Sequence, residues 1–477
     1  METLLEVLAP SFDRCRPIAL ALRLNSLPRT IEVGLACGAS LPRTVSNIPN
    51  IPHRRWRIAW LLAVGVLVNY LDRINLSVSR QALSDAFGVS LVVFGFLASA
   101  FSWTYALMQM PAGFLLDRFG VRRVGQVSTL LWSIACFAAA LAPGLNWLFA
   151  ARLLLGVSES PTFPANAKAI GYWFTASERS LATAITDAAA KFSTAVGVPF
   201  LGLLLLHFGW RWSFAATGFI SLLYFLLFYW IYRNPKQDGG LTARELEFIR
   251  EGGAQSEDPT RVMGRAAVGY LLRQRKVYGL AIGWGAYNYT FFLLLYWLPS
   301  YLSLSLHLAL LQSVLYSSFP WLVATFTDLL IGGWLVDVLI ERGWNANRVR
   351  YSVMVGGMAM GLFILGAART QNPVAALVWI SLALGGVAAA APVAWAIPSL
   401  ISPRECVGTL GGIVNSFGQI AAISAPIVTG YSVSATHSFA AAFAISSATL
   451  LLGTASYLIL LGPIEPIPEP PNPQTQD

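Results

Sequence analysis

Long apolar runs recur from residue 56 to residue 461, and they constrain the fold more than any other feature of the sequence. A helix needs about 20 mostly apolar residues to cross the hydrocarbon core of a bilayer, and about twelve runs reach that length. Polar residues are correspondingly scarce: 12% of the 477 residues are Asp, Glu, Lys or Arg, against about 25% in a soluble domain. A soluble enzyme of this size is therefore excluded, and the sequence predicts an all-α integral membrane protein.

The runs form two sets of about six, separated by a charged stretch. The predicted spans of the first set are Trp56–Ser79, Leu91–Leu116, Val124–Leu141, Trp147–Trp173, Leu181–His207 and Trp212–Tyr232. The predicted spans of the second set are Val277–Leu302, Leu311–Leu339, Tyr351–Ala368, Val374–Leu400, Val407–Ser434 and Ser438–Leu461. We therefore expect about twelve transmembrane helices in two bundles of about six.

The same pattern sets the expected domain boundaries. The two bundles take residues 54–233 and 277–462. Residues 234–276 hold much of the charge and no spanning run, so they predict a cytoplasmic linker with a short amphipathic helix around Thr242–Arg250. Residues 1–53 and the Pro-rich, acidic tail 463–477 are expected to be disordered, solvated and cytoplasmic. A start codon placed too early is an alternative explanation of residues 1–53.

Arginines in the short connections set the expected orientation. The connections on one side of the membrane are rich in arginine and contain Arg118, Arg122, Arg123, Arg179, Arg342, Arg348, Arg350 and Arg404. The connections on the other side contain few basic residues beyond Arg80, Arg211 and Arg369. By the positive-inside rule, both termini and the linker face the cytoplasm, in a bacterial plasma membrane. Topology thus explains the net charge of +9, and nucleic acid is not an expected partner.

Cysteine and histidine usage predicts neither a metal site nor a disulfide framework. The cysteines are scattered without paired spacing, and the histidines stand alone near predicted helix ends. The residues concerned are Cys15, Cys37, Cys136, Cys406, His53, His207, His307 and His437. Zinc sites and disulfide frameworks show characteristic spacings that are missing here. We therefore expect no cofactor, no metal and no catalytic residue.

A motif rich in glycine and arginine lies between the second and third predicted spans. It runs from Gly113 to Arg123 and contains Asp117, Arg118, Gly120 and Arg122. The first glycine is expected to let helices pack closely, and the second to allow a sharp turn. The acid and the bases can pair across the ends of neighbouring helices. An ordinary arginine-rich cytoplasmic loop is the alternative explanation.

A weaker copy of the motif stands at the matching place in the second half, beginning at Gly333. Two halves with a repeated motif indicate parallel repeats about an axis normal to the membrane. The motif resembles the hallmark loop of the major facilitator superfamily. That resemblance implies the superfamily's fold, with two pseudo-symmetric bundles, and a conformational gate at the cytoplasmic end. The residues it implies for the gate are Gly113, Asp117, Arg118, Arg122 and Asp337.

Ionisable residues inside the spans are functional candidates, because a charge at membrane depth costs about 2.5–3.5 kcal/mol or more. The first span contains Asp72 and Arg73, for which an ion pair near the outer headgroups is the alternative explanation. The fourth span places Arg152 and Glu159 on one face, about 10 Å apart. Burial disfavours the charged form of a carboxylate, so Glu159 is expected to gain and lose a proton. A static pair that stabilises the bundle is the alternative.

The fifth span adds Asp187 and Lys191, four residues apart on one face. Lys191 lies about 16 Å deep, and an internal salt bridge with Asp187 is the alternative to a binding role. With Arg73 and Arg152, Lys191 makes three cations in one half, which imply an anionic ligand. The carboxylates nearby are then expected to alternate between pairing with these cations and carrying protons.

The second half contributes polar and aromatic side chains without charge. Asn288, Trp395 and Asn415 suit a hydroxylated organic ligand, because rings stack on such a ligand and amides hydrogen-bond its hydroxyls. Trp297 lies near a helix end and is expected to be an interfacial anchor. Asp328 has no predicted place in the cavity.

Several stretches resemble one branch of the superfamily, the anion:cation symporters, which include carriers of sugar acids, phthalate, and sialic acid or glutamate. They are Asn69–Asn75, Phe101–Pro111, Arg152–Asn166, Tyr296–Leu302 and Gly411–Gly418, in a resemblance that covers residues 55–462. The resemblance implies protonation of Asp72 and Glu159, with Arg152 as the partner of Glu159, and carboxylate binding by Arg73. It also implies ligand contacts from Tyr70, Tyr105, Trp395 and Asn415.

The sequence therefore predicts proton-driven uptake of a small organic anion by alternating access, in a monomer within the lipid bilayer. Ala190 beside Lys191, and Gln419 in place of an expected Asn, depart from the sugar-acid carriers, so the particular acid stays open. Efflux or antiport by the same fold is the alternative. A transporter-fold sensor is the non-transport alternative, although the linker and tails are too short for a signalling domain. An enzyme is not expected.

Overall fold

The computed structural model describes residues 53–175, 178–255, 265–403 and 407–468 of the chain. The expectations for residues 1–52 and for most of the tail lie outside these ranges. Helices make up the regular structure of the described residues, as the sequence predicts. Nine helices in these ranges are long and apolar enough to cross a membrane.

The first half is built from α1 (Arg54–Val78), α2 (Arg80–Phe87), α3 (Leu91–Ala140), α4 (Leu145–Glu159), α5 (Thr162–Trp173) and α6 (Arg179–Ile231). The sequence did not predict the short α2. The long α3 and α6 each bend at one glycine, Gly120 (φ 78°) and Gly209 (φ 81°). Glycine adopts such a backbone conformation without the clash of a Cβ atom, so each of these residues joins two spans.

The second half is built from α9 (Arg275–Leu304), α10 (Leu310–Thr327), α11 (Val336–Glu341), α12 (Ala346–Gly361), α13 (Ile364–Ala367), α14 (Pro373–Ile401), α15 (Val407–Thr436) and α16 (Ala440–Ser456). The π-helical η2 (Asp328–Leu335) joins α10 to α11, and η3 (Tyr457–Leu461) extends α16. The nine apolar spans include both arms of α6. With α3 counted as two spans, and with α4–α5 and α9 added, the described chain makes twelve passes, which confirms the predicted architecture.

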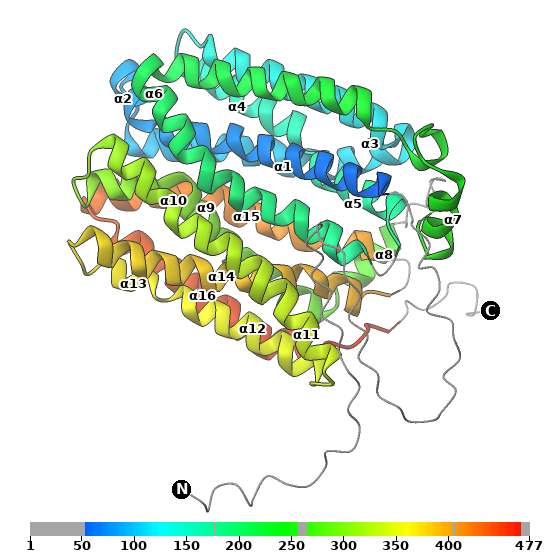
Figure 1. Cartoon of the computed structure of the whole chain (residues 1–477). Coiled ribbons are helices and arrows are strands. Elements are labelled where there is room, and N and C mark those ends of the chain that lie inside the picture. The colour runs from blue at the N-terminus through cyan, green and yellow to red at the C-terminus, as the bar shows by residue number, and fades with distance from the viewer. Residues whose placement is uncertain (1–52, 176–177, 256–264, 404–406, 469–477) are drawn as a thin grey trace, which may run out of the picture. The chain divides into compact units, whose positions relative to one another are not determined.

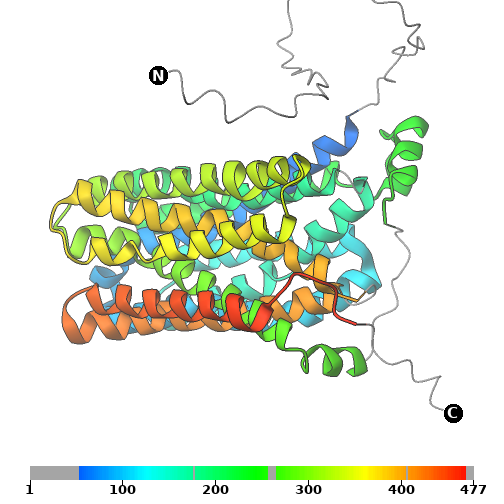
Figure 2. The ribbon, with the colours of Figure 1, turned by 90° about the horizontal axis from the view of Figure 1, so that it is seen from below.

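The spans run side by side in the two halves, as Figures 1 and 2 show. In the first half, α6 packs against α1 and α3, and α3 packs against α4. In the second half, α9 packs against α15 and α16, and α14 packs against α10 and α12. The halves meet where α3 contacts α15, α6 contacts α10 and α1 contacts α9. Side chains on α1, α6, α9 and α10 therefore lie at the interface between the halves.

We call the end of the bundle at which α1 begins the linker end, and the end at which α1 stops the far end. Toward the far end, Ser77 Oγ donates to the backbone oxygen of Tyr296 at 2.8 Å. The ring of Phe94 meets that of Trp297 edge-on, with 5.2 Å between centroids. Trp297 is fully buried, so its predicted role as an interfacial anchor is wrong. Its ring instead fills a contact between the two halves.

The linker contains η1 (Pro235–Gln237), α7 (Ala243–Glu251) and α8 (Arg265–Leu271). The helix α7 confirms the predicted helix around Thr242–Arg250. The Thr242 hydroxyl caps its start by accepting from the backbone N–H of Glu245 at 3.3 Å. The linker thus contains an ordered helix, which can hold side chains in fixed positions against the bundle.

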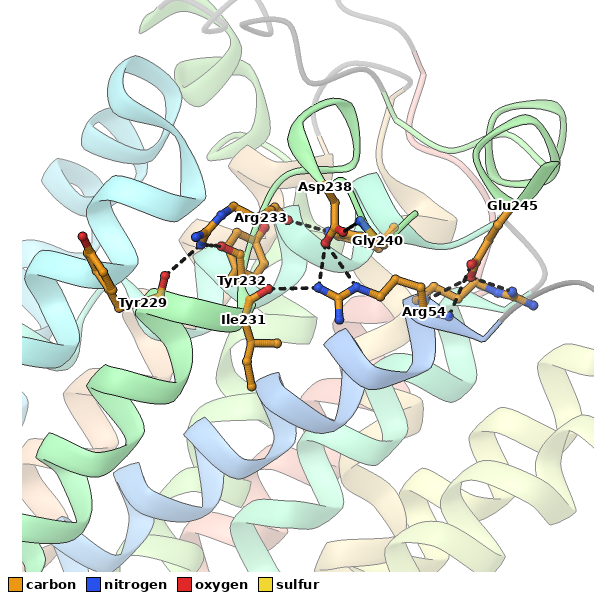
Figure 3. Close-up of polar contacts among 10 residues, drawn as sticks. Arg54, Tyr229, Ile231, Tyr232, Arg233, Asp238, Gly240 and Glu245 are labelled. Carbon is orange, nitrogen blue, oxygen red and sulfur yellow. Dashed lines mark hydrogen bonds and ion pairs between the residues drawn. The ribbon is translucent and has the colours of Figure 1, made fainter. Parts of the chain in front are cut away.

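Linker carboxylates hold the start of α1, as Figure 3 shows. Arg54 pairs with Asp238 at 2.9 Å, and Glu245 accepts from the backbone N–H groups of Arg54 at 3.3 Å and Arg55 at 3.1 Å. Arg55 also pairs with Glu178 at 2.8 Å and with Glu245 at 3.1 Å. A carboxylate at a helix N-terminus interacts favourably with the helix dipole, so Glu245 is a specific anchor of α7 on α1.

Two residues at the start of the tail pack against the second half, so the prediction of a solvated tail is wrong for Ile464 and Ile467. Ile464 and Ile467 are buried, and the backbone N–H of Ile467 donates to the backbone oxygen of Ile401 at 2.7 Å. Lys276 donates to the backbone oxygen of Pro463 at 2.9 Å. The two isoleucines bury apolar surface that a purely polar tail would lack.

Candidate functional site

Arg73 and Glu159 form a buried ion pair between α1 and α4. Nε of Arg73 lies 3.0 Å from Oε2 of Glu159, and the two side chains are 3% and 0% exposed. Helix α4 ends at Glu159 and α5 begins at Thr162, with Pro161 in the short break between them. The buried position of Arg73, together with that of Asp72, excludes an ion pair at the outer headgroups.

Three aromatic rings surround the guanidinium of Arg73. Its Cζ lies 4.8 Å from the ring centroid of Tyr70, 4.5 Å from that of Phe101 and 5.2 Å from that of Tyr105. A planar guanidinium stacks on aromatic faces in a way that an ammonium does not reproduce. The structure thus brings the predicted Tyr70 and Tyr105 to the predicted Arg73. Phe101 was not among the predicted site residues, although it opens one of the resembling stretches.

Arg152 and Asp72 lie beside this pair and contact other groups. Arg152 Nη1 donates to the backbone oxygen of Asp72 at 3.4 Å, and Nη2 donates to the Tyr296 hydroxyl at 3.5 Å. The Asp72 carboxylate accepts from Ser221 Oγ at 2.8 Å. The sequence predicts Arg152 as the partner of Glu159, whereas in the structure Glu159 pairs with Arg73 and Arg152 acts on it at longer range.

Lys191 pairs with two carboxylates, one from each half. Its Nζ lies 2.6 Å from Oδ2 of Asp187, one turn earlier on α6, and 3.2 Å from Oδ2 of Asp328 at the start of η2. The structure therefore contains the Asp187–Lys191 salt bridge, which the sequence offered as an alternative to a binding role of Lys191. It also places Asp328, for which the sequence predicted no position, beside Lys191. Single π-helical turns within α-helices occur frequently at functional sites.

A row of aromatic rings connects the surroundings of Arg73 to the second half. The rings of Tyr70 and Phe291 lie 6.3 Å apart, and those of Phe291 and Tyr287 lie 5.7 Å apart. Trp284 then stacks on Tyr287 at 4.9 Å and contacts Trp395 at 5.1 Å. The predicted Trp395 thus belongs to the same row as the predicted Tyr70. Such a row offers faces on which a sugar-like ligand can stack.

The predicted amide side chains of the second half are less closely tied to the ion pairs. Asn288 on α9 is buried, and its Nδ2 donates to the backbone oxygen of Trp284 at 2.8 Å, within its own helix. Asn415 on α15 is half-buried, and Gln419, one turn later, is buried. An amide that bonds its own helix must rotate before it can bind a ligand hydroxyl.

The predicted gate motif surrounds the bend of α3 at the linker end. Asp117 pairs with Lys168 on α5, a partner that the sequence did not predict. Gly120 provides the sharp turn, as expected. A Cβ atom on Gly113 would meet nothing within 4 Å, so the prediction that this glycine allows close helix packing is wrong.

The remaining predicted gate residues lie near this end with fewer contacts. Arg118 is exposed, and its Cζ lies 5.3 Å from the ring centroid of Phe119. Arg122 is half-buried after the bend, and Asp337 is exposed on α11 in the second copy of the motif. The two copies therefore lie on corresponding helices of the two halves.

The chemistry available at this site is the binding and release of anions and protons. The buried cations Arg73, Arg152 and Lys191 lie among carboxylates that compete with a bound anion for them. Within the described ranges, no group of three or more His, Cys, Asp or Glu side chains is placed to hold a metal ion. Sequence reasoning missed Ser221 and Tyr296 as partners, because hydroxyls on other helices leave no signal in the spacing.

Residues 62–426 match the family model described as Major Facilitator Superfamily. An uncharacterized transporter of Bacillus subtilis, YybO, is 37% identical over 419 residues, which cover 87% of this chain and 96% of that protein. A probable galactarate/D-glucarate transporter of Escherichia coli, GarP, is 34% identical over 87% of this chain and 96% of its own length.

A D-galactonate transporter of Escherichia coli is 30% identical over 86% of this chain and 96% of its own length. Among solved structures, the D-xylose-proton symporter superposes with a TM-score of 0.66 at 17% identity, covering 86% of this chain and 99% of that one. A bacterial homologue of the lysosomal transporter Spinster, inward-facing and occupied, gives 0.65 at 16% identity, covering 85% and 97%. At such identities the two structures support the fold alone.

Proposed function

Because the chain belongs to the Major Facilitator Superfamily, and is therefore an integral membrane transporter rather than an enzyme, we propose that it carries a sugar acid or related carboxylate together with protons. The observation that carries this proposal is the buried pair of Arg73 and Glu159 within three aromatic rings. The cation selects an anion, the rings select a ligand with stacking faces, and the acid couples binding to protonation.

An organic anion fits Arg73 for two reasons. A guanidinium presents a planar fork of donors that matches a carboxylate, and the rings of Tyr70, Phe101 and Tyr105 fix its plane. Relatives named as transporters of galactarate, D-glucarate and D-galactonate support a hydroxylated carboxylate. The row of rings that ends at Trp395 then offers a surface for the carbon chain of such a ligand.

Proton coupling follows from competition for Arg73. A substrate carboxylate that binds this guanidinium displaces Glu159, and an unpaired buried carboxylate is strongly disfavoured. Uptake of one proton by Glu159 removes that cost, so anion binding and protonation support each other. Asp72, which accepts a hydrogen bond from Ser221, is a second buried acid that can take part.

Alternating access is proposed between the two halves, with the linker end toward the cytoplasm of a bacterial cell. Arginines gather in the connections of that end, in agreement with the positive-inside rule. The contacts of Ser77 with Tyr296 and of Phe94 with Trp297 hold the halves together toward the far end. The pair of Asp117 and Lys168 is proposed to stabilise one state of the gate at the linker end.

Uptake by purified protein in liposomes tests the proposal. Vesicles with an alkaline interior and an acidic exterior are given radiolabelled galactonate or galactarate. We expect accumulation above the external concentration, and loss of that accumulation when a protonophore collapses the pH gradient. Accumulation of the labelled acid that does not depend on the pH gradient would contradict proton symport. Accumulation under the opposite gradient would instead support antiport or efflux.

A further inference from the structure

Lys191 ties the two halves of the bundle together at a point separate from Arg73. Its ammonium lies 3.2 Å from the Asp328 carboxylate, which belongs to the second half, and both side chains are 3% exposed. Asp187, its partner at 2.6 Å within α6, is 40% exposed. The buried part of the cluster is therefore one cation of the first half facing one acid of the second.

The Lys191–Asp328 pair shares one feature with the Arg73–Glu159 pair, although Lys191 also contacts Asp187. In each pair the acid gives one oxygen to the cation, at 3.2 Å and 3.0 Å respectively. The other oxygen, Oδ1 of Asp328 or Oε1 of Glu159, has no hydrogen bond of ordinary geometry with the described residues. A buried carboxylate with one unsatisfied oxygen is poorly stabilised in its charged form. Both acids are therefore placed to yield their cation to a better ligand.

The two cations border the same row of aromatic rings. The Tyr70 phenol lies within electrostatic range of both Arg73 and Lys191. The Tyr287 phenol, on the other side of Phe291, lies within electrostatic range of Lys191 and of both its acids. A ligand that lies along Tyr70, Phe291 and Tyr287 thus meets Arg73 at Tyr70 and lies near Lys191 along the same rings.

We infer that Lys191 binds a second carboxylate, so that the transported anion is a hydroxylated dicarboxylate held between Arg73 and Lys191. This inference rests on the proposed function and narrows its substrate class. The second carboxylate takes the place of Asp328 on Lys191, as the first takes the place of Glu159 on Arg73. Because Asp328 belongs to the other half, its displacement also frees one ion pair between the halves.

Galactarate and galactonate provide a matched pair of probes, since they differ in one carboxylate that is replaced by a hydroxymethyl group. Dissociation constants are measured on the purified full chain by ligand-induced thermal shift. The wild type is expected to bind galactarate at least about tenfold more tightly than galactonate. The Lys191→Gln variant is expected to lose about tenfold to a hundredfold in galactarate affinity and to keep its galactonate affinity. Lys191→Arg is expected to restore the preference.

Asp328→Asn separates a binding role of Lys191 from a merely structural one. If Asp328 competes with the ligand, its neutralisation raises galactarate affinity by about threefold. If the ion pair only stabilises the fold, both Asp328→Asn and Lys191→Gln lower the melting temperature and weaken both acids alike, which overturns the inference. A wild type that accumulates galactonate under a pH gradient but does not prefer galactarate overturns it too, and leaves the proposed function standing. Failure to bind either acid overturns both.

Discussion

The guanidinium of Arg73 and the carboxylate of Glu159 are paired through a single contact, Nε to Oε2 at 3.0 Å. The second carboxylate oxygen has no ordinary hydrogen bond with the described residues. A pair of this kind is less favourable than a bidentate one, so a ligand with a well-oriented carboxylate can replace the acid. The proposed coupling of anion transport to protons then depends on whether the displaced acid is neutralised, which a single substitution can test.

Glu159→Gln is expected to separate exchange from accumulation. Glutamine has the shape of a protonated glutamic acid, so Arg73 stays available to the ligand, but no proton is bound or released at this position. We expect exchange of labelled for unlabelled galactarate across the liposome membrane to continue, and accumulation driven by a pH gradient to fall to background. Glu341→Gln, on an exposed residue at the end of α11, is the control and should leave both activities unchanged. Accumulation by Glu159→Gln against a gradient would refute the proton role.

Arg73→Lys is expected to weaken anion binding although it keeps the charge. Lysine offers neither the planar fork for a carboxylate nor a flat group between Tyr70, Phe101 and Tyr105. The affinity for galactonate and galactarate should fall by about tenfold to a hundredfold, as ligand-induced thermal shift measures it. Arg211→Lys is the control, because Arg211 is exposed and stacks on Trp210 at 4.3 Å. Equal affinities for Arg73→Lys and the wild type would show that charge alone suffices.

Gly120→Ala and Gly113→Ala are expected to differ in stability although they lie seven residues apart in the same motif. Gly120 has φ 78° and ψ 163°, a backbone conformation that costs a residue with a Cβ about 1–3 kcal/mol. Gly113 is helical, and an added Cβ meets nothing within 4 Å, so alanine there should be neutral or stabilise by about 0.5–1 kcal/mol. Unfolding in detergent, followed by tryptophan fluorescence, measures both. A melting temperature that falls equally in the two variants would contradict this assignment.

The sequence predicted the spans and the buried charges because both depend on position along one helix. Asp72, Arg73 and Glu159 stand inside apolar runs, so their burial follows from the spans alone. The pairing of Arg152 with Glu159 was implied by the family resemblance. Both residues lie on α4, but a separation of seven residues puts them about 10 Å apart, and the Glu159 carboxylate pairs with Arg73 on α1 instead.

Contacts between helices could not be predicted from the spacing of residues within one helix. Asp328 lies in the π-helical η2, where the wider turn changes the direction of each following side chain from that of an α-helix. Its pairing with Lys191 also depends on how α6 and α10 are rotated and placed against each other. The burial of Trp297 against Phe94 has the same origin, since a helix end at the bundle interface and one at the lipid interface have similar compositions.

Glu245→Gln is expected to release α7 from the start of α1. The Glu245 carboxylate is fully buried and accepts from the backbone N–H groups of Arg54 and Arg55 as well as from the Arg55 guanidinium. Loss of one partner of a buried ion pair costs about 3–5 kcal/mol, so the amides of α7 should exchange with deuterium at least about a hundredfold faster. Glu247→Gln, two residues along the same helix on an exposed side chain, is the matched control. If α7 keeps its protection in Glu245→Gln, its apolar residues rather than this carboxylate hold it on the bundle.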